Sequence, residues 1–289
     1  MDGEGRLLRD YCYSLAMNPT LSIITINFNN RDGLQKTIDS VVAQSFRDFE
    51  WIVIDGGSTD GSRELLEQYS GHFSYWVSEP DKGIYNAMNK GVKVAKGDYL
   101  QFLNSGDWLC DENALARCFS HPLSADIVYG DLFFLNTDDS RERAHYPQEI
   151  SLHYLFHFSL GHSASFIRRN LLLEQPYDEQ YRIVSDWAFF LRQALAGRSF
   201  DYLDEVITCF DMTGISTVQE DLVEQERQDV ISHEIPEAII RDMVQMDEMK
   251  SILEKNHVKK VLEFGGKNKL YHRMITGVLS IIGFFDRHF

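Results

Sequence analysis

Hydrophobic positions in the first hundred residues follow two alternating patterns. Short, nearly continuous apolar runs rich in β-branched residues predict strands that are buried on both faces. These runs fall at residues 21–28, 49–54, 73–77 and 98–103. Between them, apolar residues recur at helical spacing, as in Leu34, Ile38 and Val41. Such alternation predicts an α/β fold, Rossmann-like, with a mostly parallel sheet and helices on both of its faces.

The pattern changes from about residue 126. Residues 127–129 and 132–135 are interpreted as two strands joined by a turn at Gly130-Asp131, and hence as locally antiparallel. Further strands are expected at residues 163–167, 199–203 and 206–210, and a helix at 186–196. The sequence after residue 217 is charged and helical. We therefore divide the chain into an N-terminal extension (1–19), an α/β domain (20–215) and a helical, basic C-terminal extension (216–289).

Charge is distributed unevenly along the 289 residues. The whole chain has 44 Asp or Glu against 28 Lys or Arg, a net charge of −16, so a nucleic acid is not an expected partner. Residues 250–289, however, carry eight Lys or Arg against three Asp or Glu, and they include an apolar run at 278–285. This combination suits contact with an anionic membrane surface. A C-terminal helix with solvated lysines explains it equally well.

The compartment is inferred from what the sequence lacks. Four scattered cysteines show no metal-ligand spacing, the first residues do not form a signal peptide, and no apolar run reaches 18 residues. We expect a cytoplasmic protein, peripheral on the inner face of the membrane if the basic tail docks there.

Acidic side chains lie in the loops that follow three of the predicted strands. Asp55, Asp81 and Asp107 occupy these positions, and ligands of open parallel sheets bind at the carboxyl ends of the strands. The first of these loops has one glycine, Gly33, and lacks the G-x-G-x-x-G fingerprint of dinucleotide-binding proteins. An oxidoreductase or methyltransferase is therefore disfavoured.

Five motifs, in this order, resemble those of the inverting family 2 glycosyltransferases of bacterial polysaccharide assembly, which have the GT-A fold. They are SIITIN at 22–27, WIVIDGGSTDG at 51–61, SEPDKGIYNAMNKG at 78–91, GDYLQFLNSGD at 97–107 and VSDW at 184–187. The resemblance spans roughly residues 20–215. It implies transfer of a sugar from a nucleotide diphosphate sugar, expected to be UDP-linked, to a saccharide or lipid-linked saccharide acceptor in surface polysaccharide synthesis.

The resemblance also implies a donor-nucleotide site. Its predicted members are Thr25, Asn27, Asp55, Asp81, Lys82 and Asn89. Asp55 would accept a hydrogen bond from the imide N–H of uracil, or else cap the Gly56-Gly57 loop. Lys82 would face a phosphate or be solvated, and Asn89 would border the nucleotide or lie on a helix surface.

The catalytic groups follow from the later motifs. Asp107 resembles the last carboxylate of a D-x-D-type motif that holds a divalent cation, Mn²⁺ or Mg²⁺, bridging the donor phosphates. Asn104 and Gly106 stand where carboxylates are common, so the cation would be held mainly through the phosphates. Asp186 matches the general base that deprotonates the acceptor hydroxyl. Its alternative role is that of a carboxylate at a helix N-terminus.

Three residues are candidates for acceptor contact: His162, Tyr181 and Trp187. Each can equally be a structural side chain. The alternative to an enzyme is a non-catalytic nucleotide-sugar-binding module of the same fold, which the thinned motif at 104–107 would suit.

Overall fold

The computed structural model describes residues 18–135, 140–211 and 219–254. The chain divides into two compact units, residues 1–231 and 232–289. The first unit thus includes most of the helix that follows the predicted domain boundary at residue 215. The predicted N-terminal extension, except its last two residues, and the basic run from Lys255 onward lie outside the described residues.

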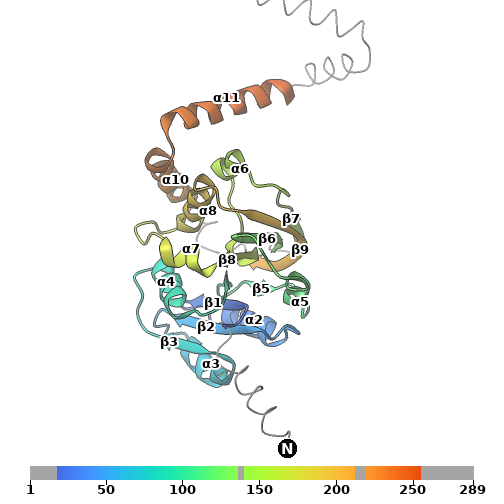
Figure 1. The fold of residues 1–289 in the computed structure, drawn as a ribbon. Helices are drawn as coiled ribbons and strands as arrows, with labels where there is room; N and C mark the ends of the chain where they lie inside the picture. Colours follow the sequence, from blue (N-terminus) through green and yellow to red (C-terminus); the bar gives the residue numbers. More distant parts are fainter. Residues whose placement is uncertain (1–17, 136–139, 212–218, 255–289) are drawn as a thin grey trace, which may run out of the picture. The chain divides into compact units, whose positions relative to one another are not determined.

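Four parallel strands form one half of the sheet, as the hydrophobic pattern predicts (Figure 1). They lie in the order β3-β2-β1-β4, and all three pairings are parallel. Their bounds are β1 Leu21–Asn27, β2 Phe49–Asp55, β3 Tyr75–Ser78 and β4 Tyr99–Phe102. Because β1 lies between β2 and β4, the chain crosses from one side of β1 to the other, and such switch points form ligand crevices.

Helices cover both faces of this half. The helices are α2 (Arg31–Val42), α3 (Ser62–Gln68), the short η1 (Ser70–His72) and α4 (Ile84–Val94). Leu34 and Ile38 of α2 share a core cluster with Ile23 of β1. On the opposite face, α4 lies so close to β1 that a Cβ added at Gly91 would come within 2.5 Å of Ile24.

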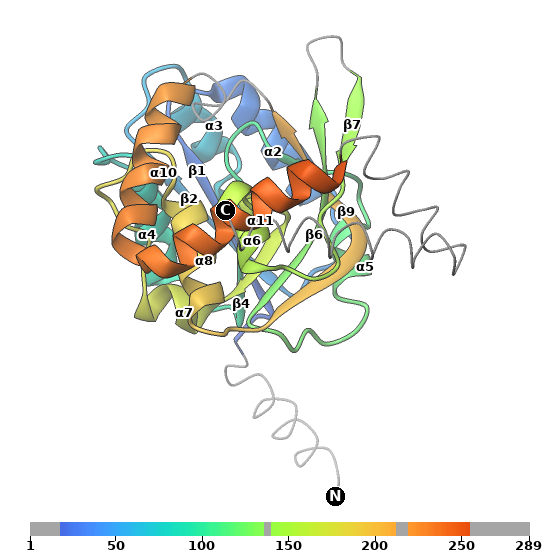
Figure 2. The same cartoon turned by 90° about the horizontal axis from the view of Figure 1, so that it is seen from above.

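The other half of the sheet is mixed. β8 (Ser165–Arg168) pairs antiparallel with both β4 and β6 (Ile127–Leu135). β6 runs parallel to β9 (Phe200–Asp211), and β7 (Arg141–Ala144) lies antiparallel to β6 (Figure 2). A two-residue strand, β5 (Trp108–Leu109), pairs antiparallel with β9.

The antiparallel pair predicted at 127–135 is wrong, because these residues form the single strand β6. A Cβ at Gly130 would lie 2.7 Å from the carbonyl oxygen of Glu205, so this glycine permits a close approach of β9 and does not form a turn. The two strands predicted at 199–203 and 206–210 are likewise one strand. Its register against β6 shifts at Gly130/Asp131, and this irregularity explains the break in its pattern.

Shorter helices connect the strands of the second half. They are α5 (Ala114–Cys118), α6 (Leu152–His157), η2 (His162–Ala164), α7 (Arg169–Glu174) and α8 (Ser185–Leu195), followed by α10 (Glu220–Glu234) and α11 (Glu237–Glu254). None of the helices in the described ranges is long and apolar enough to cross a membrane.

Candidate functional site

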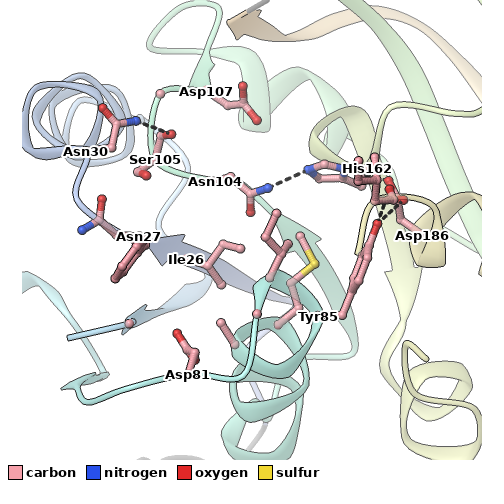
Figure 3. Close-up of a pocket in the computed structure, with 18 of the residues that line it drawn as sticks. Ile26, Asn27, Asn30, Asp81, Tyr85, Asn104, Ser105, Asp107, His162 and Asp186 are labelled. Carbon is pink, nitrogen blue, oxygen red and sulfur yellow. Dashed lines mark hydrogen bonds and ion pairs between the residues drawn. The ribbon is translucent and has the colours of Figure 1, made fainter. Parts of the chain in front are cut away.

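A cavity of about 560 Å³ lies at the carboxyl ends of β1 to β4, where the parallel-sheet rule places a ligand. Figure 3 shows the polar side chains that face it. The lining residues come from the ends of β1 and β2, the loops after β3 and β4, the N-terminal part of α4, η2, the segment that begins α8, and β9. They are Ile26, Asn27, Phe28, Asn30, Gly56, Asp81, Gly83, Ile84, Tyr85, Ala87, Met88, Asn104, Ser105, Gly106, Asp107, His162, Arg182, Ile183, Asp186 and Phe210.

Three buried acceptors in this cavity lack a hydrogen-bond donor among the described residues: Asn27 Oδ1, Asp81 Oδ1 and Asn104 Oδ1. Buried polar atoms are nearly always hydrogen-bonded in folded proteins, and an orphaned one costs about 1–3 kcal/mol. Three such atoms around one cavity indicate that it binds either a ligand with hydrogen-bond donors or a cation that these oxygens coordinate.

Asp55, at the end of β2, is fully buried and is not among the lining residues. Its Oδ1 accepts hydrogen bonds from Asn27 Nδ2 at 2.7 Å and Ser58 Oγ at 2.5 Å. Its Oδ2 accepts from Ser78 Oγ at 2.6 Å and from the Ser58 backbone N–H at 3.0 Å. Burial raises the pKa of Asp55, but these hydrogen bonds outweigh it, and the pKa lies below its usual value. Asp55 thus fixes the loop and holds the Asn27 amide beside the cavity.

Asp81 presents its carboxylate to the cavity from the loop after β3. Lys90 Nζ lies 3.6 Å from its Oδ1. Burial raises the pKa of Asp81 above its usual value, against the opposing effect of Lys90. A Cβ at Gly56 would lie 2.8 Å from Asp81 Oδ2, so only glycine leaves room for this carboxylate at the end of β2.

The other three predicted nucleotide residues do not line the cavity. Thr25 is fully buried, and its hydroxyl accepts a hydrogen bond from Trp51 Nε1 at 3.0 Å. Lys82 is exposed. Asn89 exchanges hydrogen bonds with the backbone of Tyr177, donating to its carbonyl at 2.8 Å and accepting from its N–H at 3.1 Å. Thr25 and Asn89 therefore build the walls behind the site.

The loop after β4 carries Asn104 and Asp107 into the cavity. Thr37 of α2 anchors this loop, because its hydroxyl lies 2.7 Å from Asp107 O and 3.1 Å from the Gly106 N–H. Asn30 Nδ2 adds a hydrogen bond to Ser105 O at 2.9 Å. The Asp107 side chain is 5% exposed, and it faces the same space as the orphaned Asn104 Oδ1.

Asp186 stands at the opposite end of the cavity, in the first turn of α8. Its Oδ1 lies 2.8 Å from the Tyr85 hydroxyl and its Oδ2 lies 3.1 Å from His162 Nδ1 (Figure 3). His162 Nε2 lies 3.0 Å from Asn104 Nδ2. A chain of hydrogen bonds therefore joins the loop after β4 to the first turn of α8.

This pairing sets the charge of both partners. Burial raises the pKa of Asp186, but the hydrogen bond and charge of His162 and the Tyr85 hydroxyl outweigh it, so its pKa falls below the usual value. Burial lowers the pKa of His162, yet Asp186 outweighs it and the pKa of His162 is raised. Asp186 is thus a carboxylate at neutral pH, able to accept a proton.

The remaining acceptor candidates, Tyr181 and Trp187, are buried and lie outside the cavity lining. Tyr181 donates its hydroxyl to Asp229 Oδ2 at 2.9 Å. Trp187 donates its indole N–H to Leu155 O at 2.7 Å. In the structure both aromatics therefore pack around the start of α8.

Most of the cavity lining was not predicted from the sequence, and four of these residues bear on its chemistry: Phe28, Tyr85, Asn104 and Arg182. Phe28 is 66% exposed at its edge, and Tyr85 touches Asp186 from α4. From the sequence, Asn104 stands out only because it occupies a position where a carboxylate is common. Arg182 is exposed and makes no ion pair with any described residue. A large aromatic residue at the end of the predicted strand 21–28 was the available signal for Phe28. The other three residues could be identified only from contacts made in the folded protein.

The cavity carries net negative charge. Asp81, Asp107 and Asp186 line it, whereas Arg182 is the one Lys or Arg among the described lining residues. An anionic ligand such as a diphosphate would therefore need additional positive charge to bind here.

Comparison with known proteins gives consistent matches. The family model described as "Glycosyl transferase family 2" matches residues 22–206. An uncharacterized glycosyltransferase of Mycobacterium tuberculosis is 35% identical over 237 residues, covering 80% of this chain and 84% of that protein. The putative teichuronic acid biosynthesis glycosyltransferase TuaG of Bacillus subtilis is 39% identical over 100 residues, covering 32% of this chain and 39% of that protein.

The fold is shared with solved structures. The crystal structure of S. aureus TarS 1–349 in complex with UDP-GlcNAc superimposes with a TM-score of 0.58 at 19% identity, covering 78% of this chain and 70% of that one. A likeness at this identity establishes the fold alone, and the fold is the GT-A fold that the sequence predicts.

Proposed function

The chain belongs to glycosyl transferase family 2, and from this premise we propose that it transfers a sugar from a nucleotide diphosphate sugar to a saccharide acceptor, with inversion at the anomeric carbon. One observation carries the proposal: two orphaned amide oxygens, the Asp81 carboxylate and the hydrogen-bonded Asp186 carboxylate face a single cavity at the ends of the parallel strands. The N–H and O–H groups of a nucleotide sugar can donate hydrogen bonds to the orphaned oxygens. Its anomeric carbon is an electrophile for a hydroxyl of the acceptor saccharide that the Asp186 carboxylate activates.

The nucleotide end of the cavity is assigned to β1 and the loop after β3. Asn27 Oδ1 and Asp81 Oδ1 can each accept a hydrogen bond from a base N–H, such as the imide of uracil. The exposed ring of Phe28 offers a face for base stacking. Asp55 would act indirectly, by holding Asn27 and the loop in place. A UDP-sugar is the donor proposed, in keeping with the UDP-GlcNAc bound by TarS.

A divalent cation fits the residues of the loop after β4. The Asp107 carboxylate and the orphaned Asn104 Oδ1 are hard oxygen donors of the kind that Mg²⁺ and Mn²⁺ prefer. When bound, the cation would neutralise the diphosphate as it leaves. Because carboxylates outnumber basic side chains in the cavity lining, a diphosphate would need the positive charge of such a cation to bind there.

Asp186 is the proposed general base. The acceptor hydroxyl would attack the anomeric carbon while its proton moves to a carboxylate oxygen of Asp186, and the bond from that carbon to the diphosphate would break. Tyr85 and His162 hold the carboxylate in one orientation and keep it ionised. Such positioning by neighbouring side chains is a large part of catalysis by a general base.

For the acceptor, we propose a lipid-linked saccharide in surface polysaccharide synthesis. The teichuronic acid assignment of TuaG supports the polysaccharide part of this proposal. Membrane contact through the basic run at 255–289 and a cytoplasmic location stay predictions, since that run lies outside the described residues. Sedimentation of the full chain with anionic and with neutral vesicles tests the membrane contact.

Thermal unfolding with UDP, GDP, dTDP or CDP, each with and without Mn²⁺, tests the donor site. A ligand at about 100 times its Kd adds roughly 2.7 kcal/mol of stability. We expect one nucleoside diphosphate to raise the Tm, more so with Mn²⁺, and the Mn²⁺ increment to vanish in Asp107→Asn. No shift with any of the four nucleotides would refute the proposal. Turnover of the matching nucleotide sugar then separates an enzyme from a binding module.

A further inference from the structure

The segment just before Asp186 is held from both sides. The carbonyl of Ile183 lies 2.5 Å from the Tyr85 hydroxyl on the cavity side. On the other side, the carboxylate of Glu226, in α10, accepts three consecutive backbone N–H groups. Its Oε1 is 2.7 Å from the N–H of Arg182, and its Oε2 is 2.9 Å and 3.3 Å from those of Ile183 and Val184. The peptide between Ile183 and Val184 is therefore bound by Glu226 at its N–H, and its C=O shares the single proton of the Tyr85 hydroxyl with Asp186 Oδ1.

Glu226 binds the chain directly before α8, at the N-cap residue Val184 and the two residues that precede it. Val184, the residue before the helix, makes no side-chain capping hydrogen bond. The N–H groups at the start of a helix lack partners within the helix, and the helix dipole is positive at this end. A carboxylate bound to several N–H groups makes charge-assisted hydrogen bonds there, which are stronger than neutral ones. Glu226 thus holds, from a distant helix, the three residues that lead into α8.

Neighbouring residues of α10 reinforce the contact. Asp229 accepts the hydroxyl of Tyr181 at 2.9 Å, one residue before the held segment. The guanidinium of Arg227 lies 4.0 Å from the ring centroid of Trp187, one residue after Asp186. The same guanidinium donates to Phe156 O at 3.0 Å. α10 therefore contacts the chain on both sides of Asp186, without lining the cavity itself.

We propose that Glu226 is a positioning residue for the transfer reaction: it fixes residues 182–184 so that Asp186 faces the acceptor. The proposal rests on the function proposed above, and it concerns a helix beyond the residues 22–206 that match the family model. Glu226 does not touch the cavity, so it acts only through the backbone it holds.

The expected consequence is selective for turnover. A misplacement of about 1 Å at a reacting group can lower a rate on the order of 10²-fold. The nucleotide end of the cavity is formed by Asn27 and Asp81, which come from other elements. Loosening residues 182–184 should therefore lower kcat while leaving donor affinity unchanged.

Glu226→Gln is the test variant. The glutamine keeps the size of the side chain. Its NH₂ group, however, would face backbone N–H groups that are bound by a carboxylate oxygen in the wild type. Glu224→Gln is the matched control, because Glu224 lies on the same helix, is exposed, and bonds Gln228 Nε2 at 2.8 Å instead. Glu226→Asp keeps the charge on a shorter side chain and should restore part of the activity.

Three quantities are measured in each full-length variant: nucleoside diphosphate release from the nucleotide sugar, donor Kd by calorimetry, and hydrogen exchange of the amides of residues 182–184. We expect Glu226→Gln to lower kcat about tenfold or more, to leave the donor Kd within about twofold of wild type, and to accelerate exchange at these amides. Glu224→Gln should match wild type in all three.

Two results would overturn the inference. Equal kcat in Glu226→Gln and Glu224→Gln would show that the held segment does not govern turnover. A parallel loss of kcat, donor affinity and Tm in Glu226→Gln would show a purely structural role. Wild-type protein that releases no nucleoside diphosphate from any nucleotide sugar would instead refute the proposed function itself. The exchange measurement distinguishes the cases, because it reports the Glu226 contacts without requiring activity.

Discussion

The substitution Asp186→Asn tests the proposed mechanism most directly, because it removes the charge of the general base with almost no change in size. In the wild type, both carboxylate oxygens accept hydrogen bonds, from Tyr85 at 2.8 Å and from His162 at 3.1 Å. An asparagine offers one oxygen, and its NH₂ group must face the other donor. The loss of one charge-assisted hydrogen bond costs about 1.5–3 kcal/mol of stability.

The magnitude of the kinetic effect follows from the role assigned to the carboxylate. General-base catalysis contributes about 10²–10⁴ in rate, which corresponds to a barrier increase of about 2.7–5.4 kcal/mol. Donor binding should not weaken, because the nucleotide contacts assigned to Asn27 and Asp81 are untouched. Removing one of three carboxylates also reduces the repulsion that the cavity exerts on a diphosphate.

The assay compares nucleoside diphosphate release and donor Kd in Asp186→Asn and in a contrasting variant, Asp81→Asn. We expect Asp186→Asn to lose about 10²–10⁴ in kcat with an unchanged or lower Kd, and Asp81→Asn to raise the donor Kd more than it lowers kcat. Retention of kcat within about tenfold of wild type, or loss of donor binding in Asp186→Asn, would refute the assignment of the base.

The remaining predictions concern stability. The pKa of His162 is raised and that of Asp186 lowered by their pairing, so its stabilisation should be complete between pH 3.8 and pH 6.5. It should disappear as pH falls through the folded pKa of Asp186 or rises through that of His162. Thermal unfolding of His162→Gln and of wild type, followed from well below pH 3.8 to well above pH 6.5, measures this loss, and a Tm difference that stays constant over that whole span would contradict it. Gly130→Val should lower the free energy of unfolding by about 1–3 kcal/mol, because its Cβ would lie 2.7 Å from Glu205 O. Gly71→Ala is the control and should lower it less, because a Cβ at Gly71 meets open space. Equal losses of Tm in the two variants would contradict the close approach of β9 at Gly130.

Some of this structure was predictable because it depends on local pattern. Continuous apolar runs identified the four parallel strands, and the crossover connections place their carboxyl ends together. Any polar residue at such an end is then directed to one edge of the sheet. Asn27, Asp81 and Asp107 follow this rule, and all three line the cavity.

Gly130 and Asp55 show where local pattern is ambiguous. A glycine in an apolar run can mark a turn or a close approach of two backbones, and Gly130 is of the second kind only because Glu205 packs against it. Asp55 occupies the same kind of position as Asp81, yet Ser58 and Ser78 use its oxygens. Nothing in the spacing of Asp55 and Asp81 distinguishes the buried carboxylate from the one that faces the cavity.

The sequence by itself determined the α/β alternation, the edge of the sheet where the cavity lies, and the family motifs that single out Asp186. Only the tertiary structure decided how that carboxylate is held. Asn104 and His162 are 58 residues apart, His162 and Asp186 are 24 apart, and Tyr85 is 101 residues from Asp186. Periodicity reports the burial of each segment separately, whereas these contacts arise when segments distant in the chain pack around one cavity, and so they leave no local pattern to read.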